Sequence, residues 1–158
     1  MAKKKETMEN ELKDSTKKVK VVKLKILTVT GKRKTAIARA TIRKGNGDIR
    51  INHKPLDTLN HLRKLSILEP IRIAEEVIKD EMKKIDIDVN VSSGGTESQI
   101  EASRLAIARA LVVYTQNAEL KSAFLAYDRA LIVADVRRKE MRKPGDSKAR
   151  ARRQTSYR

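Results

Sequence analysis

The chain of 158 residues contains no cysteine, no tryptophan, one phenylalanine and three tyrosines. The absence of cysteine excludes disulfide bonds, a thiolate nucleophile and a zinc site with cysteine ligands. The two histidines, His53 and His61, have no cluster of carboxylates beside them, so we expect no metal ion and no cofactor. No apolar run approaches the length of a membrane-spanning helix, and the N-terminus lacks the apolar segment of a secretory signal. These absences predict a cytoplasmic protein without membrane contact.

Basic side chains are in large excess and are unevenly distributed. The chain has 37 Lys and Arg against 20 Asp and Glu, a formal net charge of +17. Residues 26–44 contain six basic and no acidic residues, and residues 137–158 contain ten basic and two acidic residues. Residues 45–136 have a net charge of −2. Because a local excess of one sign attracts a partner of the other sign, this distribution points to nucleic acid.

The N-terminal half of the chain has strand-like patterns separated by turn residues. Apolar and β-branched residues over 19–30 predict a first strand, and small and β-branched residues over 35–43 predict a second. The Gly-Asn-Gly sequence at 45–47 predicts a turn, and the alternating residues 48–52 predict a strand that pairs back as a hairpin. Residues 1–20 are rich in Lys, Glu, Thr and Asn and are expected to be disordered.

In the second half of the chain, most apolar residues recur at the spacing of a helix. Asp57 can cap a short helical segment, and Pro70 suits the first turn of a new helix. Thr96 and Gln99 fit a capping box, with Thr96 as the N-cap of a further helix. The elements expected from here on are a helix from 70 to about 82, a strand over 85–91, a helix from 96 to about 115, a helix over 118–126 and a last strand over 131–133.

This order of elements predicts an α+β fold in which helices cover one face of a sheet. Three regions are expected along the chain. Residues 1–20 form a Lys/Glu-rich extension, residues 21–136 a globular nucleic-acid-binding domain, and residues 137–158 an extended basic tail.

No arrangement of catalytic residues is present. Asp86 and Asp88 lie on the same face of the expected strand, but the chain offers no base to pair with them, so a solvated strand face is the better interpretation. Residues 31–35, Gly-Lys-Arg-Lys-Thr, superficially resemble a phosphate loop, yet the glycine-rich lead-in is missing and a strand follows. We therefore predict that the protein is not an enzyme.

Two basic segments carry the strongest functional signal. Arg39 and Arg43 alternate with small or apolar residues, so both project from one strand face and form a stripe suited to phosphates. The tail has too little apolar content to fold alone, and Tyr157 near its end can stack on a base or bond to a 2′-hydroxyl. The scarcity of aromatic residues favours backbone recognition over base stacking on a sheet. Composition alone leaves open an architectural DNA-binding protein that uses the same cations.

A series of motifs spans about residues 24–158. In order they are Gly31-Lys-Arg-Lys-Thr-Ala-Ile-Ala-Arg-Ala40, Gly45-x-Gly47-x-Ile49-x-Ile51-Asn52, Gln99-x-x-Ala102-x-Arg104-x-x-Ile107-Ala-Arg-Ala-Leu111, Asp135-x-Arg137-x-x-Glu140, Lys143-Pro-Gly145 and Ala149-Arg-Ala-Arg-Arg-Gln-x-Ser-Tyr-Arg158. Together they closely resemble the small-subunit ribosomal protein S-nine family in its archaeal form. Ser98 and Thr155 depart from that family, which usually has a glycine and a lysine at these places.

The resemblance implies a ribosomal-protein-S-five-domain-two-like fold, a four-stranded sheet with helices on one face, acting as a structural constituent of the small ribosomal subunit. It implies that ribosomal RNA in the head of the subunit is bound by Lys32, Arg33, Lys34, Arg39, Arg43, Arg137, Arg138 and Lys143. It implies that the tail reaches the anticodon stem of the peptidyl-site tRNA through Lys148, Arg150, Arg152, Arg153, Ser156, Tyr157 and Arg158. The remaining expected partners are neighbouring proteins of the head, with the chain ribosome-bound and not a homo-oligomer.

Overall fold

The computed structural model describes residues 26–145, 148–151, 154 and 157. The strands are β1 (Leu27–Arg33), β2 (Ala36–Lys44), β3 (Ile49–Ile51), β4 (Lys54–Pro55) and β5 (Ile85–Ser92). The α-helices are α2 (His61–Ile78), α3 (Thr96–Thr115) and α4 (Ala118–Tyr127), and the short 3-10 helices are η1 (Leu56–Thr58), η2 (Lys79–Lys84) and η3 (Arg129–Leu131). The expected disorder of residues 1–20 lies outside the described residues, as does the part of the first expected strand before residue 26.

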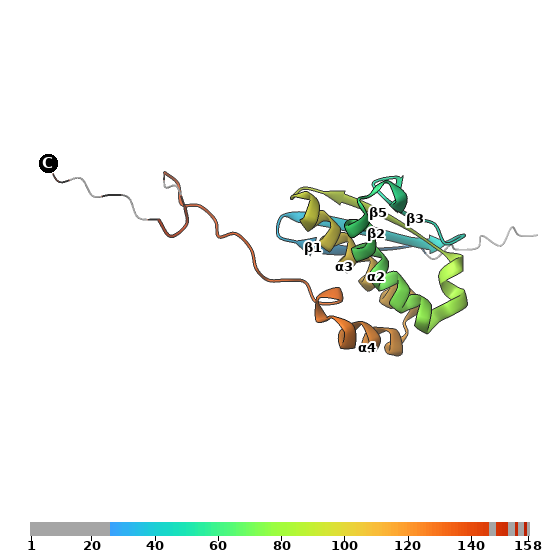
Figure 1. The fold of residues 1–158 in the computed structure, drawn as a ribbon. Coiled ribbons are helices and arrows are strands. Elements are labelled where there is room, and N and C mark those ends of the chain that lie inside the picture. Colours follow the sequence, from blue (N-terminus) through green and yellow to red (C-terminus); the bar gives the residue numbers. More distant parts are fainter. Residues whose placement is uncertain (1–25, 146–147, 152–153, 155–156, 158) are drawn as a thin grey trace, which may run out of the picture.

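A single mixed sheet with the strand order β1-β2-β5-β3-β4 forms one layer of the domain (Figure 1). Only β3 and β5 pair in parallel, and the other neighbouring strands are antiparallel. The sheet has five strands where the resemblance implied four, although β4 contributes only two residues. The α+β class is therefore confirmed.

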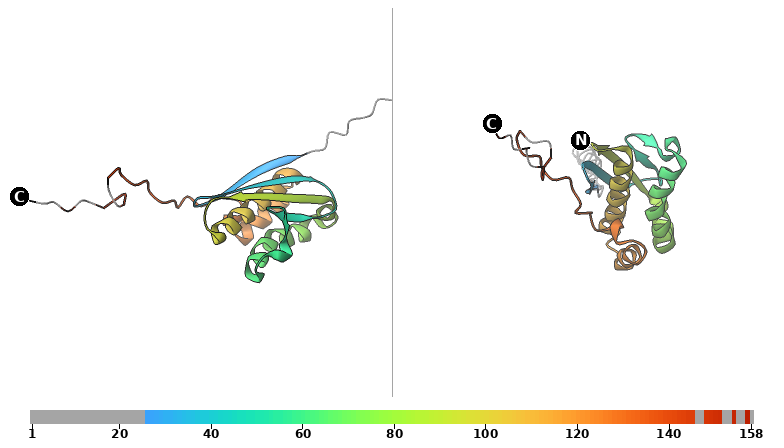
Figure 2. Two further views of the ribbon diagram at one scale, coloured as in Figure 1. Left: turned by 90° about the horizontal axis from the view of Figure 1, so that it is seen from above. Right: turned by 60° about the vertical axis from the view of Figure 1, so that its left-hand side comes forward.

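The helices lie on one side of this sheet, with α3 packed on β1, β2 and β5, α2 beside α3, and α4 packed on α2 and α3 (Figure 2). Small side chains make the close approach possible. Ala36, Ala38 and Ala40 of β2 are fully buried beneath the helices, and α3 buries a row of alanines that includes Ala102 and Ala106. The opposite face of the sheet is not covered by any described element (Figure 2).

The expected hairpin between residues 35–43 and 48–52 is wrong. β5 lies between β2 and β3 and pairs with both of them. The alternating pattern of residues 48–52 correctly indicated a strand, but alternation identifies a half-buried face and not the partner. β5 is eight residues long and contributes buried Ile85, Ile87 and Val89, so pairing along β5 buries more apolar surface than a three-residue hairpin could.

Two expected helix starts are also wrong. Pro70 lies inside α2, which runs unbroken through it. Ile67, Ile71 and Ala74 form one buried stripe across this position, and their packing outweighs the ~3 kcal/mol penalty of an internal proline. At the start of α3 the N-cap is Gly95 and not Thr96, and Gln99 Nε2 donates to the Ser93 carbonyl instead of completing a capping box.

The expected strand over 131–133 is replaced by η3 and an irregular segment. Asp128 Oδ1 accepts a hydrogen bond from Ala130 N at 2.8 Å and starts the 3-10 turn, which buries Leu131. Arg109 Nε donates to the Ile132 carbonyl at 2.7 Å. Side chains therefore form hydrogen bonds here with backbone groups that would otherwise pair with a neighbouring strand.

Candidate nucleic-acid interface

The open face of the sheet displays the expected arginine stripe. Ala38, Ala40 and Ile42 are buried toward the helices, while Arg39 and Arg43 are exposed on the other face. This alternation confirms that the two arginines share a face. Thr28 Oγ1 and Thr41 Oγ1 lie 3.2 Å apart on that face, so the surface around the arginines is polar.

The two arginines differ in their surroundings. Arg43 Nη2 lies 3.0 Å from Asp88 Oδ2, and Arg43 Nε lies 3.7 Å from Asp86 Oδ2. Arg39 sits opposite Asn90 in the register and forms no ion pair within the described residues. Asp86 and Asp88 therefore neutralise one end of the stripe, and Arg39 is the more available cation.

Asp86 also holds the loop between β2 and β3, a role that no local pattern in the sequence predicts. Its Oδ1 accepts hydrogen bonds from Asn46 N at 2.7 Å and from Gly47 N and Asp48 N at 3.1 Å each. Burial raises the pKa of this carboxyl, but the three N–H donors and Arg43 outweigh burial and leave the pKa below its usual value. Three convergent N–H groups make the ionised form a structural part of the loop.

The three cations at the first turn have different roles. Lys32 and Lys34 are exposed, and Lys34 adopts a φ of 52° in the two-residue turn between β1 and β2. The Arg33 side chain is only 18% exposed, and its Nε donates to Glu101 Oε2 at 2.5 Å. Arg33 Nη1 also forms an ion pair with Asp135 Oδ2. Arg33 is therefore an internal ion-pair partner, unlike its two neighbours.

Three arginines bind the segment that leads into the tail, which we call the anchor segment (residues 128–137). Arg33 pairs with Asp135, and Arg109 donates to the Ile132 carbonyl and, at 3.3 Å, to the Thr30 carbonyl. Arg104 Nη2 lies 3.2 Å from Asp128 Oδ2 and 2.5 Å from Glu69 Oε2. These contacts connect the anchor segment to β1, α2 and α3. Sequence reasoning placed Arg104 and Arg109 only within a motif, because pairing partners 23 or more residues away leave no local pattern.

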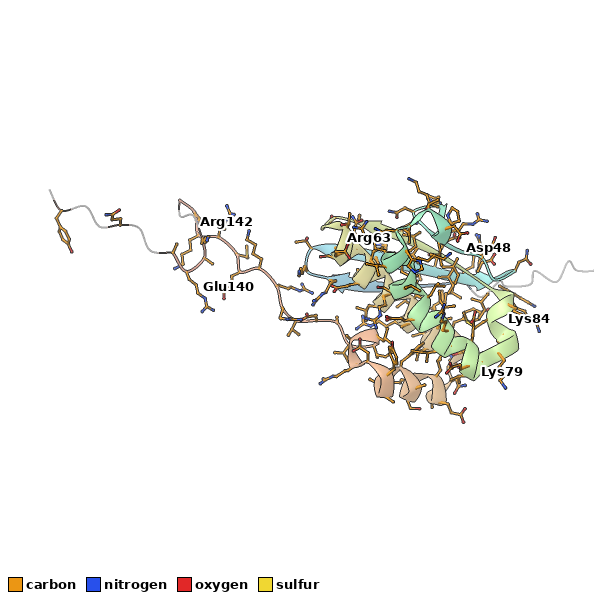
Figure 3. The ribbon with its side chains drawn as sticks, in the orientation of Figure 1. Asp48, Arg63, Lys79, Lys84, Glu140 and Arg142 are labelled. Carbon is orange, nitrogen blue, oxygen red and sulfur yellow. The ribbon has the colours of Figure 1, made fainter. Side chains whose placement is uncertain are left out.

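The tail leads away from the body on the side where β1 turns into β2 (Figures 1 and 2). Arg138, Lys143 and Lys148 are exposed, and Glu140 and Arg142 project from the tail at a distance from the body (Figure 3). Tyr157 is 93% exposed. Arg137 is 80% exposed and pairs with Asp135 at the base of the tail. The expected tail residues that lie outside the described residues are Arg152, Arg153, Ser156 and Arg158.

Within the tail, Arg150 makes a two-pronged ion pair with Glu140. Arg150 Nη2 lies 2.5 Å from Glu140 Oε1, and Arg150 Nε lies 2.9 Å from Oε2. The Arg150 hydrogen bonds lower the pKa of Glu140, and the same bonds raise the pKa of Arg150. Because both side chains are largely exposed, salt weakens this pair, and a phosphate can take the place of Glu140.

The different roles of Lys32 and Arg33 lead to a first prediction. We expect Arg33→Met to lower the free energy of unfolding by about 2 kcal/mol, because Glu101 and Asp135 lose their shared partner. Lys32→Met removes the same charge from an exposed position and should change the free energy of unfolding by less than ~0.5 kcal/mol. Urea denaturation of both variants measures the difference. Equal effects would show that Arg33 is not an internal partner.

The described residues contain no group of three or more His, Cys, Asp or Glu side chains placed to hold a metal ion. Among the helices of the described part, none is long and apolar enough to span a membrane. His53 and His61 are both exposed.

The family model described as Ribosomal protein S9/S16 matches residues 31–158. The protein named small ribosomal subunit protein uS9 from Methanococcus vannielii is 47% identical over 138 residues, which cover 85% of this chain and all of the relative. The protein of the same name from Methanococcus maripaludis strain C5 is 46% identical over the same coverage. The match begins at the glycine of the first motif and includes the anchor segment and the tail. The chain thus belongs to the ribosomal protein S9/S16 family, a family of structural, non-enzymatic proteins of the small ribosomal subunit.

Proposed function

We propose that the chain binds ribosomal RNA in the head of the small subunit and extends its tail to the tRNA in the peptidyl site. The separation of charge supports this proposal most strongly. Residues 45–136 of the body have a net charge of −2, whereas residues 26–44 have a net charge of +6 and the tail over 137–158 has a net charge of +8. The described part of the tail leads away from the body, and its exposed cations Arg138, Lys143 and Lys148 form no ion pair within the described residues, so they are available to RNA phosphates.

Five of the eight residues named above lie in the body, and we propose that only three of these five contact RNA. Lys32, Lys34 and Arg39 are exposed and form no ion pair within the described residues, so they are available to phosphates. Arg33 and Arg43 already bind carboxylates of the same chain. We therefore assign Lys32, Lys34 and Arg39 as phosphate ligands, and Arg33 as a residue that positions the tail.

In the tail we assign a continuous path of phosphate contacts. It starts at Arg137 and Arg138, continues through Lys143, Lys148 and Arg150, and ends with the group Arg152, Arg153, Ser156, Tyr157 and Arg158. Arginine suits such a path because its planar guanidinium forms two parallel hydrogen bonds to a phosphate. We propose that Arg158 at the end of the tail lies nearest to the tRNA, as the resemblance to the family implies. We also propose that the chain contacts neighbouring proteins of the head and acts in the cytoplasmic ribosome. Each small subunit would contain one copy of the chain.

Removal of residues 148–158 tests the proposed function. Small subunits reconstituted with the shortened chain should still contain it after sedimentation in high salt, because the body contacts remain. Their affinity for peptidyl-site tRNA should fall about tenfold, as expected for the loss of one or two charge-assisted hydrogen bonds. The matched control keeps the length of the tail and replaces its Lys and Arg over 148–158 with Gln. It should show the same loss.

Two results would oppose the proposal. Unchanged tRNA affinity in both variants would show that the tail does not reach the tRNA. Equal binding of the full chain to duplex DNA and to structured ribosomal RNA, measured at the same salt concentration, would favour an architectural DNA-binding protein that uses the same cations.

A further inference from the structure

A hollow of about 550 Å3 lies where the anchor segment crosses α3 and the end of β1. This volume falls in the ~300–1,000 Å3 range of ligand sites in proteins. Ion pairs join the helices to the anchor segment around the hollow. Arg33 pairs with Glu101 of α3 and with Asp135. Arg104 pairs with Glu69 of α2 and with Asp128. The hollow is therefore preformed in the folded chain.

Part of the lining of the hollow is apolar. Leu105 of α3 and Ala130, Val133 and Val136 of the anchor segment line it. Val133 is 42% exposed and Val136 is 88% exposed, so two branched aliphatic side chains face solvent beside a concave surface. Exposed apolar side chains grouped in a concavity mark a surface that is covered by a partner.

The rim of the hollow is cationic. Five basic and three acidic side chains line it, and the three acids, Glu101, Asp128 and Asp135, are each paired with an arginine. Lys32 and Arg129 also line it and form no ion pair within the described part of the chain. Arg137, which begins the basic tail, completes the rim. An anionic ligand would therefore find cations whose charge is not already cancelled.

We propose that this hollow holds one unstacked nucleotide of the ribosomal RNA, with its base against the apolar lining residues and its flanking phosphates on the cationic rim. The inference rests on the proposed function and gives it a specific site. Exposed aliphatic side chains beside unpaired cations match a base joined to phosphates, because the base can cover the aliphatic side chains while the phosphates meet the cations. The rim is continuous with the tail through Arg137, so an RNA strand that follows the tail passes the hollow.

Photo-crosslinking from inside the hollow tests this inference. A photoreactive phenylalanine analogue replaces Val133 in the full chain, and the chain is reconstituted into small subunits. We expect a crosslink to one or two adjacent, unpaired RNA nucleotides, located by primer extension. The matched control carries the analogue at Val113, which is 47% exposed on α3 but does not line the hollow, and should not crosslink to those nucleotides.

A third position separates failure of this inference from failure of the proposed function. Met141 in the tail is 90% exposed and carries the same probe. An RNA crosslink from position 141 without one from position 133 would overturn the nucleotide site alone. A crosslink from position 133 to a protein would assign the hollow to a protein side chain and would also overturn the inference. Without an RNA crosslink from either position, the proposed RNA contacts of the tail would fail as well.

Filling the hollow provides an independent measurement. Ala130 is exposed and lines the hollow, so Ala130→Trp adds a large side chain without disturbing the core. We expect this variant to keep the thermal midpoint of the free protein and to lower the Val133 crosslink yield at least tenfold. The crosslinked nucleotide should also become several-fold more reactive toward a base-specific chemical probe. Unchanged yield and reactivity would contradict the site.

Discussion

Replacing Gly31 with alanine is expected to destabilise the folded chain by about 3 kcal/mol or more, the upper range for inserting an atom into a packed interior. A Cβ at Gly31 would lie 2.7 Å from Ala106 N and closer still to the Ala102 carbonyl oxygen. Both atoms belong to the backbone of α3, so no side-chain rotation relieves the clash. The whole helix would have to move away from β1. Urea denaturation of the purified protein measures the effect.

Gly95→Ala is the control for this prediction. A Cβ at Gly95 meets no atom within 4 Å, although the residue is the N-cap of α3. We expect a change of no more than ~1 kcal/mol, the usual effect of replacing an N-cap glycine. Because α3 also supplies Arg104 and Arg109 to the anchor segment, Gly31→Ala should weaken retention of the chain in high-salt subunits, whereas Gly95→Ala should not. Equal destabilisation by the two substitutions would show that close packing of β1 on α3 is not the cause.

Replacing Asp86 with alanine should lower the free energy of unfolding by ~2–4 kcal/mol, because three N–H groups and Arg43 lose a charged acceptor. Asp86→Asn keeps an amide oxygen for the same N–H donors and loses only the charge. We expect it to cost about half as much as the alanine substitution, since hydrogen bonds to ions are roughly twice as strong as neutral ones. Chemical denaturation at neutral pH measures the free energy of unfolding of the native chain, Asp86→Asn and Asp86→Ala, and we expect it to fall in that order.

The pH dependence of the same site gives a second readout. The pKa of Asp86 is lowered in the folded protein, so its ionised form is stabilised by folding. This contribution is complete above the ordinary aspartate pKa of 3.8, which applies to the unfolded chain, and is lost as the pH falls through the lower folded pKa. The stability difference between the native chain and Asp86→Asn should therefore shrink on acidification below about pH 4. A difference that stays constant down to pH 2 would contradict the ionic role of Asp86.

Much of the fold follows from local patterns along the chain. The alternation over 85–91 identified β5, and alternation over 35–43 placed Arg39 and Arg43 on one face. The helices over 96–115 and 118–126 also match α3 and α4 closely. These elements were predictable because burial of one face imposes a period of two residues on a strand, and an apolar, alanine-rich run of this length favours a helix.

Strand pairing and helix boundaries were less predictable, for physical reasons that differ. β3 pairs with β5 because β5 is a long strand with three buried aliphatic residues, and its central position in the sheet keeps these residues buried. Proline and capping rules described the ends of isolated helices, yet Pro70 lies within α2 because packing of its neighbours outweighs its local preference. In both cases the energy that decides the outcome comes from residues far away in the sequence.

The sequence by itself determined the class of the protein through its charges, their concentration in the first basic strand and the tail, and the motifs of its family. Only the tertiary structure decided which cations remain free. Arg33 and Lys32 are adjacent in the chain, but Arg33 meets Glu101, 68 residues away, and Lys32 meets solvent. Charge is a property of a residue, whereas its neutralisation depends on what folding places within about 4 Å of it.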